Sequence, residues 1–118
     1  MYKELTRINS VEEIKEFFSK NLQDNFFTEN ELKLAEKKNV IKSLGARYLI
    51  KKTILEYLDI ENKYKDIEIV NHSTGKPIVI FTGSVKEKIR ESGITNVQVS
   101  ISHSRNFISS IVIIEKDV

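Results

Sequence analysis

Residues 40–58 read VIKSLGARYLIKKTILEYL, and their apolar side chains recur with the period of an α-helix. Ile41, Leu44, Tyr48, Leu55 and Leu58 stand at helical spacing along this stretch. The segments before it carry helix-start signals, whereas those after residue 62 alternate with a period of two. The stretch therefore predicts a long helix that separates a helical N-terminal part from a sheet-forming C-terminal part.

Three hydroxyl residues indicate helix starts, because each is followed by a glutamate three positions later. These pairs are Ser10 with Glu13, Thr28 with Glu31, and Ser84 with Glu87. In such a capping box the hydroxyl and the carboxylate accept hydrogen bonds from backbone N–H groups that have no partner inside the helix. We predict helices over about residues 10–23, directly after Thr28, and over 84–91, with Gly93 closing the last one.

The sequence beyond residue 62 predicts antiparallel strands. Residues 66–70, 77–81, 97–102 and 107–114 combine β-branched side chains with alternation or with short apolar runs. Because residues 111–114 are all apolar, we expect a cover on each face of that strand and an oligomeric protein. Together the elements predict a single α+β domain over residues 1–118, with N-terminal helices followed by an antiparallel sheet that one helix interrupts.

The composition fits an ordinary globular domain and argues against several classes of protein. The 118 residues are 40% hydrophobic, and 19 basic against 17 acidic residues give a net charge of +2, too small to indicate nucleic-acid binding. Cysteine is absent, which excludes disulfides and thiolate metal sites. No apolar run approaches the roughly 18 residues of a membrane span. The start, MYKELTRINS, lacks a signal-peptide core, and we expect a cytoplasmic protein without a membrane partner.

Arg47 and Lys51 are the first candidate binding residues, because a spacing of four places them on one face of the long helix. Lys52 is the next residue along the chain. A guanidinium and ammonium groups on a rigid scaffold suit a phosphate or a diphosphate. The alternative is that these residues are solvated charges on an exposed helix face.

Two short segments of the sheet-forming part add further candidates. Residues 75–77, Gly-Lys-Pro, present Lys76 at a turn between two strands. Ser102 and His103 stand at the end of the strand over 97–102, where a hydroxyl and an imidazole can donate hydrogen bonds to a phosphate monoester. An ordinary hairpin turn and a structural histidine are the alternatives, and we interpret His72 as structural.

Five segments stand in an order and at a spacing that carry a resemblance. They are Phe27–Leu32 (FTENEL), Ser43–Lys52 (SLGARYLIKK), Asp66–Ile69 (DIEI), Gly75–Pro77 (GKP) and Val99–Ser104 (VSISHS). Taken together, the chain resembles the small 4′-phosphopantetheinyl transferases of the holo-acyl-carrier-protein synthase kind. The resemblance extends from about residue 7 to residue 115, which is nearly the whole chain.

The resemblance implies an enzyme that moves the 4′-phosphopantetheine arm of coenzyme A to a serine of an acyl carrier protein, releasing 3′,5′-adenosine bisphosphate. It also implies a trimer with Mg²⁺-dependent active sites between subunits. By matching position, Arg47 and Lys51 would face coenzyme A or the carrier protein, and Lys76 would lie near the nucleotide. Ser102 and His103 would bind coenzyme A, with His103 at the 3′-phosphate.

Two departures from the family concern its Mg²⁺ ligands. Aligning Arg7 and Ile8 with the family pattern places the aspartate of its opening strand at about Met1, so we expect that strand to be essentially missing. The second carboxylate corresponds to Lys52, whereas Glu56 lies one helical turn, about 5.4 Å, further along. Because Mg²⁺ needs oxygen ligands at about 2.1 Å, we expect no Mg²⁺ site from this chain's own residues, with Lys52 and Glu56 at altered catalytic positions.

Three functions remain open from the sequence. The chain is one part of a composite enzyme, in which a homologous partner supplies the metal ligands and His103 and Lys76 bind coenzyme A. Alternatively, it is a stand-alone transferase in which Lys51 and Lys52 neutralise the diphosphate. The third possibility is a catalytically inactive homologue that binds coenzyme A or a carrier protein as a scaffold or regulator.

Overall fold

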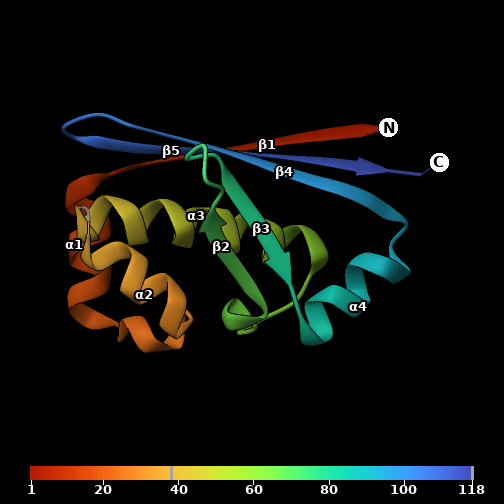
Figure 1. Ribbon diagram of the computed structural model, residues 1–118, viewed down its shortest axis with the longest axis horizontal. Helices are drawn as coiled ribbons and strands as arrows, with labels where there is room; N and C mark the ends of the chain where they lie inside the picture. The colour runs from red at the N-terminus through yellow and green to blue at the C-terminus, as the bar shows by residue number, and fades with distance from the viewer. Residues whose placement is uncertain (38, 118) are drawn as a thin grey trace.

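The predicted central helix is present as α3 (Val40–Leu58), with the predicted bounds. Asn39 begins it, because the Asn39 Oδ1 atom accepts a hydrogen bond from the N–H of Lys42 at 3.1 Å. Asp59 ends it in the left-handed conformation, with φ of 57°. Most of the helix is buried between the other elements, so α3 is the axis of the domain (Figure 1).

A computed structural model describes residues 1–37 and 39–117. The other elements are β1 (Tyr2–Ser10), α1 (Val11–Lys20), η1 (Gln23–Asn25), α2 (Glu29–Glu36), η2 (Tyr64–Asp66), β2 (Ile67–Asn71), β3 (Pro77–Phe81), α4 (Gly83–Glu91), β4 (Ile94–His103) and β5 (Phe107–Lys116). The strands form a three-stranded sheet of order β1-β5-β4 and a two-stranded sheet of order β2-β3. Both sheets are antiparallel, and the predicted α+β class is confirmed.

The prediction that the opening strand is missing is wrong. Strand β1 runs for nine residues and pairs with β5 from Tyr2 opposite Glu115 to Ser10 opposite Phe107. The alignment located a lost side chain at Met1, but a strand forms through main-chain hydrogen bonds and does not need that side chain. The chain therefore begins with a strand, before its helices.

Two of the three predicted capping boxes are confirmed, and the third is wrong. Ser10 with Glu13 begins α1, and Thr28 with Glu31 begins α2. Helix α4 begins one residue before Ser84, and its first turn is capped by a distant residue. The Oδ2 atom of Asp66 accepts hydrogen bonds from the N–H and hydroxyl of Ser84, at 3.1 and 2.9 Å, and from the N–H of Val85.

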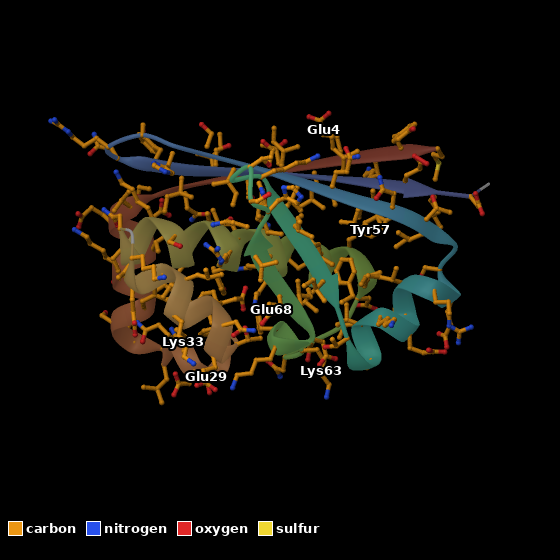
Figure 2. All side chains as sticks on the ribbon, viewed as in Figure 1. Glu4, Glu29, Lys33, Tyr57, Lys63 and Glu68 are labelled. Carbon is orange, nitrogen blue, oxygen red and sulfur yellow. The ribbon has the colours of Figure 1, made fainter. Side chains whose placement is uncertain are left out.

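The three-stranded sheet has one face covered by helices and one face free of them in the single chain. Ile108, Val112 and Ile114 of β5 are buried on the inner face, which packs on α3. Ile111 and Ile113 point to the outer face and are only half-buried. Glu4 of β1 projects from the outer face away from the helices (Figure 2). In the described chain, the predicted cover is therefore present on one face of β5 only.

Hydrophobic residues fill the space on both sides of α3. One cluster joins α3 to both sheets, and the other joins its first half to α1 and α2. Within residues 1–37 and 39–117, none of the helices is both long enough and apolar enough to span a membrane.

Candidate functional site

The first half of α3 and the β2–β3 hairpin enclose a cleft of about 450 Å³. Its walls come from the N-terminal turns of α3, from the hairpin and from the end of β4. The lining residues are Asn39, Lys42, Ser43, Ala46, Arg47, Asn71, Gly75, Pro77, Ile101 and His103. Two predicted residues from distant segments, Arg47 and His103, thus come together at one cleft.

The guanidinium of Arg47 is held in one orientation by main-chain and hydroxyl groups. Its Nε donates to the carbonyl of Ile69 at 3.0 Å, and its Nη1 donates to the hydroxyl of Ser43 at 2.7 Å and more weakly to the Ser43 carbonyl. Its Nη2 makes no hydrogen bond to any described residue, and the side chain borders the cleft. Burial lowers the pKa of Arg47, and the nearby Glu31 carboxylate opposes that effect.

The charged groups that line the cleft are all basic. Lys42 and Arg47 are cations, the imidazole of His103 can donate a hydrogen bond, and none of the lining residues is acidic. The N-terminal turn of the 19-residue helix α3 also borders the cleft at Asn39, where its helix dipole is positive. The arrangement favours an anion, and a phosphate group is the kind of ligand that these donors suit.

Lys51 lies elsewhere than the sequence prediction implied. Its side chain is 0% exposed, and its ammonium donates to Glu31 Oε1 at 2.5 Å and to the carbonyl of Phe26 at 2.7 Å. Burial lowers the pKa of Lys51, while the Glu31 carboxylate favours the charged form. The ammonium is thus bonded inside the fold and does not line the cleft.

Lys76 and Ser102 flank the cleft without lining it. Gly75 adopts a positive φ of 90° at the hairpin turn, and Lys76 borders a neighbouring groove between β3 and β4. Ser102 and His103 both border a third hollow on the outer face of the sheet, together with Ile8, Ser104, Phe107 and Ser109. His103 therefore lies at the boundary between the cleft and the outer face.

A separate pocket of about 370 Å³ lies between β1 and α3. Here the Nε of Arg7 donates to the Thr53 hydroxyl at 2.7 Å, and its Nη2 forms an ion pair with Glu56. Lys52, one turn before Glu56, has its ammonium 5.9 Å from the centre of the Tyr48 ring. Glu56 is thus already paired with an internal cation.

Comparisons with known proteins identify the family. The chain is 34% identical to a holo-[acyl-carrier-protein] synthase of Clostridium tetani over 116 residues, covering 95% of this chain and 89% of that protein. This chain belongs to the holo-[acyl-carrier-protein] synthase family. The predicted membership of the 4′-phosphopantetheinyl transferase superfamily is therefore confirmed. No protein-family model matches the chain.

Solved structures of the family share the fold. A crystal structure of the holo-[acyl-carrier-protein] synthase from Neisseria meningitidis aligns with a TM-score of 0.83 at 21% identity, covering 96% of this chain and 97% of that one. The Helicobacter pylori protein, solved in complex with coenzyme A, aligns with a TM-score of 0.76 at 19% identity, covering 96% and 100%. At these identities the likeness shows the fold.

The residues at the family's metal position do not fit Mg²⁺. The two positions expected to carry carboxylates hold Met1 and Lys52, and Glu56 is bound to the guanidinium of Arg7. An ammonium beside the site repels a divalent cation, and a carboxylate in an ion pair must first lose its partner to bind one. Within the described residues, no cluster of three histidine or acidic side chains is placed to hold a metal.

Several residues of the cleft were not predicted. Lys42 was missed because its charge resembles that of any exposed lysine, although it lies in the first turn of a helix whose start was predicted. Asn39 and Asn71 were missed because each ends a loop or a strand, where polar residues are common. Glu31 was recognised only as a helix cap, since nothing local to it indicates its contact with Lys51.

Proposed function

We propose that this chain is a 4′-phosphopantetheinyl transferase subunit that binds coenzyme A and acts as one part of a composite or oligomeric active site on an acyl carrier protein. The observation that carries the proposal is the cleft, whose charged lining groups are all basic and which includes the oriented guanidinium of Arg47, whose Nη2 has no partner in the described part of the chain. Family membership and the coenzyme A complex of the Helicobacter pylori relative support the choice of ligand.

The chemistry of coenzyme A matches the cleft. Its 3′-phosphate and its diphosphate carry the negative charges that Arg47 and Lys42 would bind, with the imidazole of His103 as a further hydrogen-bond donor. In the transfer, the serine hydroxyl of the carrier protein attacks the phosphorus next to pantetheine. The bond to the adenosine-side phosphate breaks, 3′,5′-adenosine bisphosphate leaves, and the serine loses its proton. Arg47 would keep the nucleotide end fixed during this step.

A partner subunit would complete the site. The two positions that carry metal ligands in the family hold Met1 and Lys52 in this chain, and the Glu56 carboxylate one helical turn away is paired with Arg7, so its own residues supply no metal-dependent step. His103 borders both the cleft and the hollow on the outer face of the sheet. A second subunit seated on that face would therefore approach the nucleotide site. A metal-competent homologue in that position would add the missing carboxylates.

The altered metal position also supports a second function, a catalytically inactive homologue that binds coenzyme A or a carrier protein as a scaffold or regulator. A stand-alone transferase without metal has less support, because one of its two proposed cations, Lys51, is buried and bonded to Glu31. Lys52 alone would then have to stabilise the diphosphate, and a single ammonium is a weak replacement for a divalent ion.

A transfer assay separates these functions. Apo-carrier protein and coenzyme A are incubated with the chain alone, with a metal-competent homologue from the same host alone, and with both, each with Mg²⁺ or EDTA. Mass spectrometry then measures the phosphopantetheine added to the carrier protein. Transfer that needs both proteins supports the composite site, and transfer that survives EDTA supports the stand-alone enzyme. Binding of coenzyme A without transfer in any mixture supports the inactive homologue, and absence of binding contradicts the proposal.

The outer face provides a second test. Ile8 is 64% exposed and Phe107 is 53% exposed in the single chain, next to the half-buried Ile111 and Ile113. We expect Ile8→Glu to lower the mass measured by light scattering if a subunit covers this face. Leu22→Glu, which changes a leucine that is 72% exposed and lies away from the sheet, is the matched control and should leave the mass unchanged. A monomeric wild-type chain, alone and with the homologue, would contradict this part of the proposal.

A further inference from the structure

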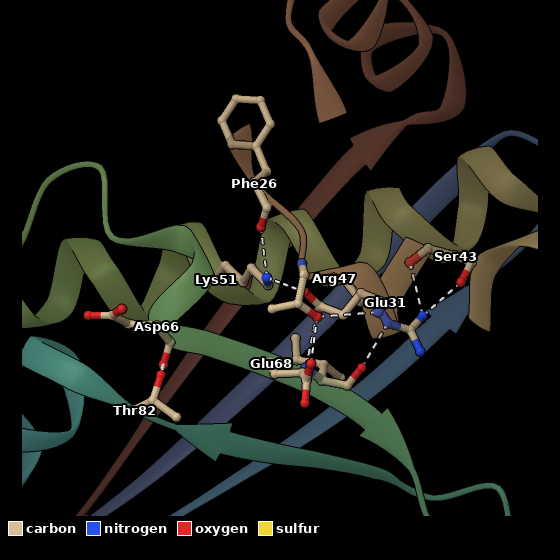
Figure 3. A network of polar contacts seen from close by, with 10 residues as sticks. Phe26, Glu31, Ser43, Arg47, Lys51, Asp66, Glu68 and Thr82 are labelled. Carbon is tan, nitrogen blue, oxygen red and sulfur yellow. Dashed lines mark hydrogen bonds and ion pairs between the residues drawn. The ribbon is translucent and has the colours of Figure 1, made fainter. Parts of the chain in front are cut away.

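One edge of strand β2 is bonded to side chains of other elements and not to a neighbouring strand. Its other edge pairs with β3, where Ile69 lies opposite Val79. On the free edge the N–H of Ile69 donates to Glu31 Oε2 at 3.0 Å, and the carbonyl of Ile69 accepts from Arg47 Nε at 3.0 Å. Both main-chain polar groups of Ile69 are thus satisfied by side chains, those of Glu31 on α2 and Arg47 on α3, which Figure 3 labels.

Glu31 is the centre of this network. Its Oε1 accepts from the ammonium of Lys51 at 2.5 Å and from the N–H of Thr28 at 3.0 Å, while its Oε2 is bound to Ile69. The side chains of Glu31 and Lys51 are 0% exposed. A carboxylate with three donors and no access to water has one stable position, so it fixes the main chain of Ile69.

The buried members of this network carry more positive than negative charge. Arg47, Lys51 and Glu31 are all buried and together bear two positive charges and one negative charge. Glu68 is a further carboxylate beside these three residues; it is half-buried, and its Oε2 accepts a hydrogen bond from the Thr28 hydroxyl. The ammonium of Lys51 is bonded to Glu31 and Phe26 inside the fold, whereas the Nη2 of Arg47 has no hydrogen-bond partner among the described residues, so Arg47 presents positive charge to the cleft.

We propose that Glu31 is a positioning residue for the anion in the cleft, acting on Arg47 through the main chain of Ile69. This inference rests on the proposed function, because it requires a phosphate of coenzyme A to contact Arg47. Glu31 holds the N–H of Ile69, and the carbonyl of the same residue sets the direction of the guanidinium. Neutralising Glu31 loosens that carbonyl, so Arg47 loses part of its orientation while keeping its charge.

Calorimetry with coenzyme A tests the proposal in a double-mutant cycle. Arg47→Met should weaken binding about tenfold to a hundredfold, as expected for loss of a charge-assisted hydrogen bond. Glu31→Gln should weaken binding roughly threefold to tenfold in the wild-type background and by less than about twofold in the Arg47→Met background. Glu13→Gln is the matched control, because Glu13 holds the same capping-box position on α1 and does not line the cleft. It should leave the dissociation constant unchanged.

Each result bears on a different claim. If Arg47→Met leaves coenzyme A binding unchanged, the proposed nucleotide site itself is wrong. If Arg47→Met weakens binding but Glu31→Gln acts equally in both backgrounds or in neither, the positioning role is overturned. Where Glu31→Gln folds poorly, the double variant Glu31→Gln/Lys51→Met removes the buried charges together and is expected to fold. It should show the same loss of affinity, and wild-type affinity in that variant would overturn the inference.

Discussion

Replacing Lys51 with methionine tests the structural role that the fold gives this residue. Methionine fills a similar volume but leaves the carbonyl of Phe26 without a donor and the Glu31 carboxylate buried beside only two N–H groups. Removing one partner of a buried ion pair costs about 3–5 kcal/mol. The free energy of unfolding of a domain of this size is roughly 5–15 kcal/mol, so the variant should remain folded but only marginally stable.

Urea unfolding at neutral pH, followed by circular dichroism, measures the change. The expected loss corresponds to a fall in Tm of roughly 10–25 °C. Adding Glu31→Gln to Lys51→Met should restore about 1–3 kcal/mol, because the carboxylate no longer remains buried without its cation. A loss below about 1 kcal/mol in the single variant, or strictly additive effects in the double variant, would refute the reasoning.

Three further predictions concern other parts of the chain. Asp66→Ala should destabilise the protein by about 1–2 kcal/mol in urea unfolding, because it removes the cap of α4; Ser84→Ala should cost less, since two backbone donors keep their acceptor. Arg7→Met should lower the free energy of unfolding by about 1 kcal/mol, because it removes the ion pair with Glu56. Neither Mg²⁺ nor EDTA should shift the Tm of the wild-type chain, and a rise in Tm with Mg²⁺ would contradict the conclusion that its residues do not fit this ion. Hydrogen bonds from the backbone and side chain of Ser10 lower the pKa of Glu13 in the folded protein. The ionised Glu13 carboxylate therefore stabilises the fold at a pH above its unfolded-state pKa, and this stabilisation is lost as the pH falls through the lowered folded-state pKa. Glu13→Gln should therefore show a smaller loss of Tm on acidification than wild type.

The helical part of the fold was predictable because its signals are local. The start and end of α3, and the capping boxes at Ser10 and Thr28, depend on residues within a few positions of each helix terminus. The cap of α4 was predicted wrongly for the same reason, since Asp66 supplies it from 18 residues away. Distant caps leave no local pattern.

The candidate site was predictable only in part. Spacing correctly placed Arg47 and Lys51 on one face of α3, but it gave no indication of what covers that face. The packing of α2 and β2 against α3 decides which of the two side chains is accessible. Glu31 of α2 binds Lys51 inside the fold, whereas Arg47 borders the cleft. Strand β1 was missed because the alignment placed a lost family side chain at Met1, whereas the strand depends on main-chain pairing with β5 about a hundred residues away.

The pairing of β1 with β5 has a consequence for the order of events during synthesis. Strand β1 is synthesised well before its partner β5, which lies about a hundred residues later, from Phe107 to Glu115. Closing so long a loop is slow, so β1 must wait with both edges unpaired while the helices form behind it. During that interval the unpaired edges of β1 are open to pairing with a strand of another chain, which is a route to aggregation.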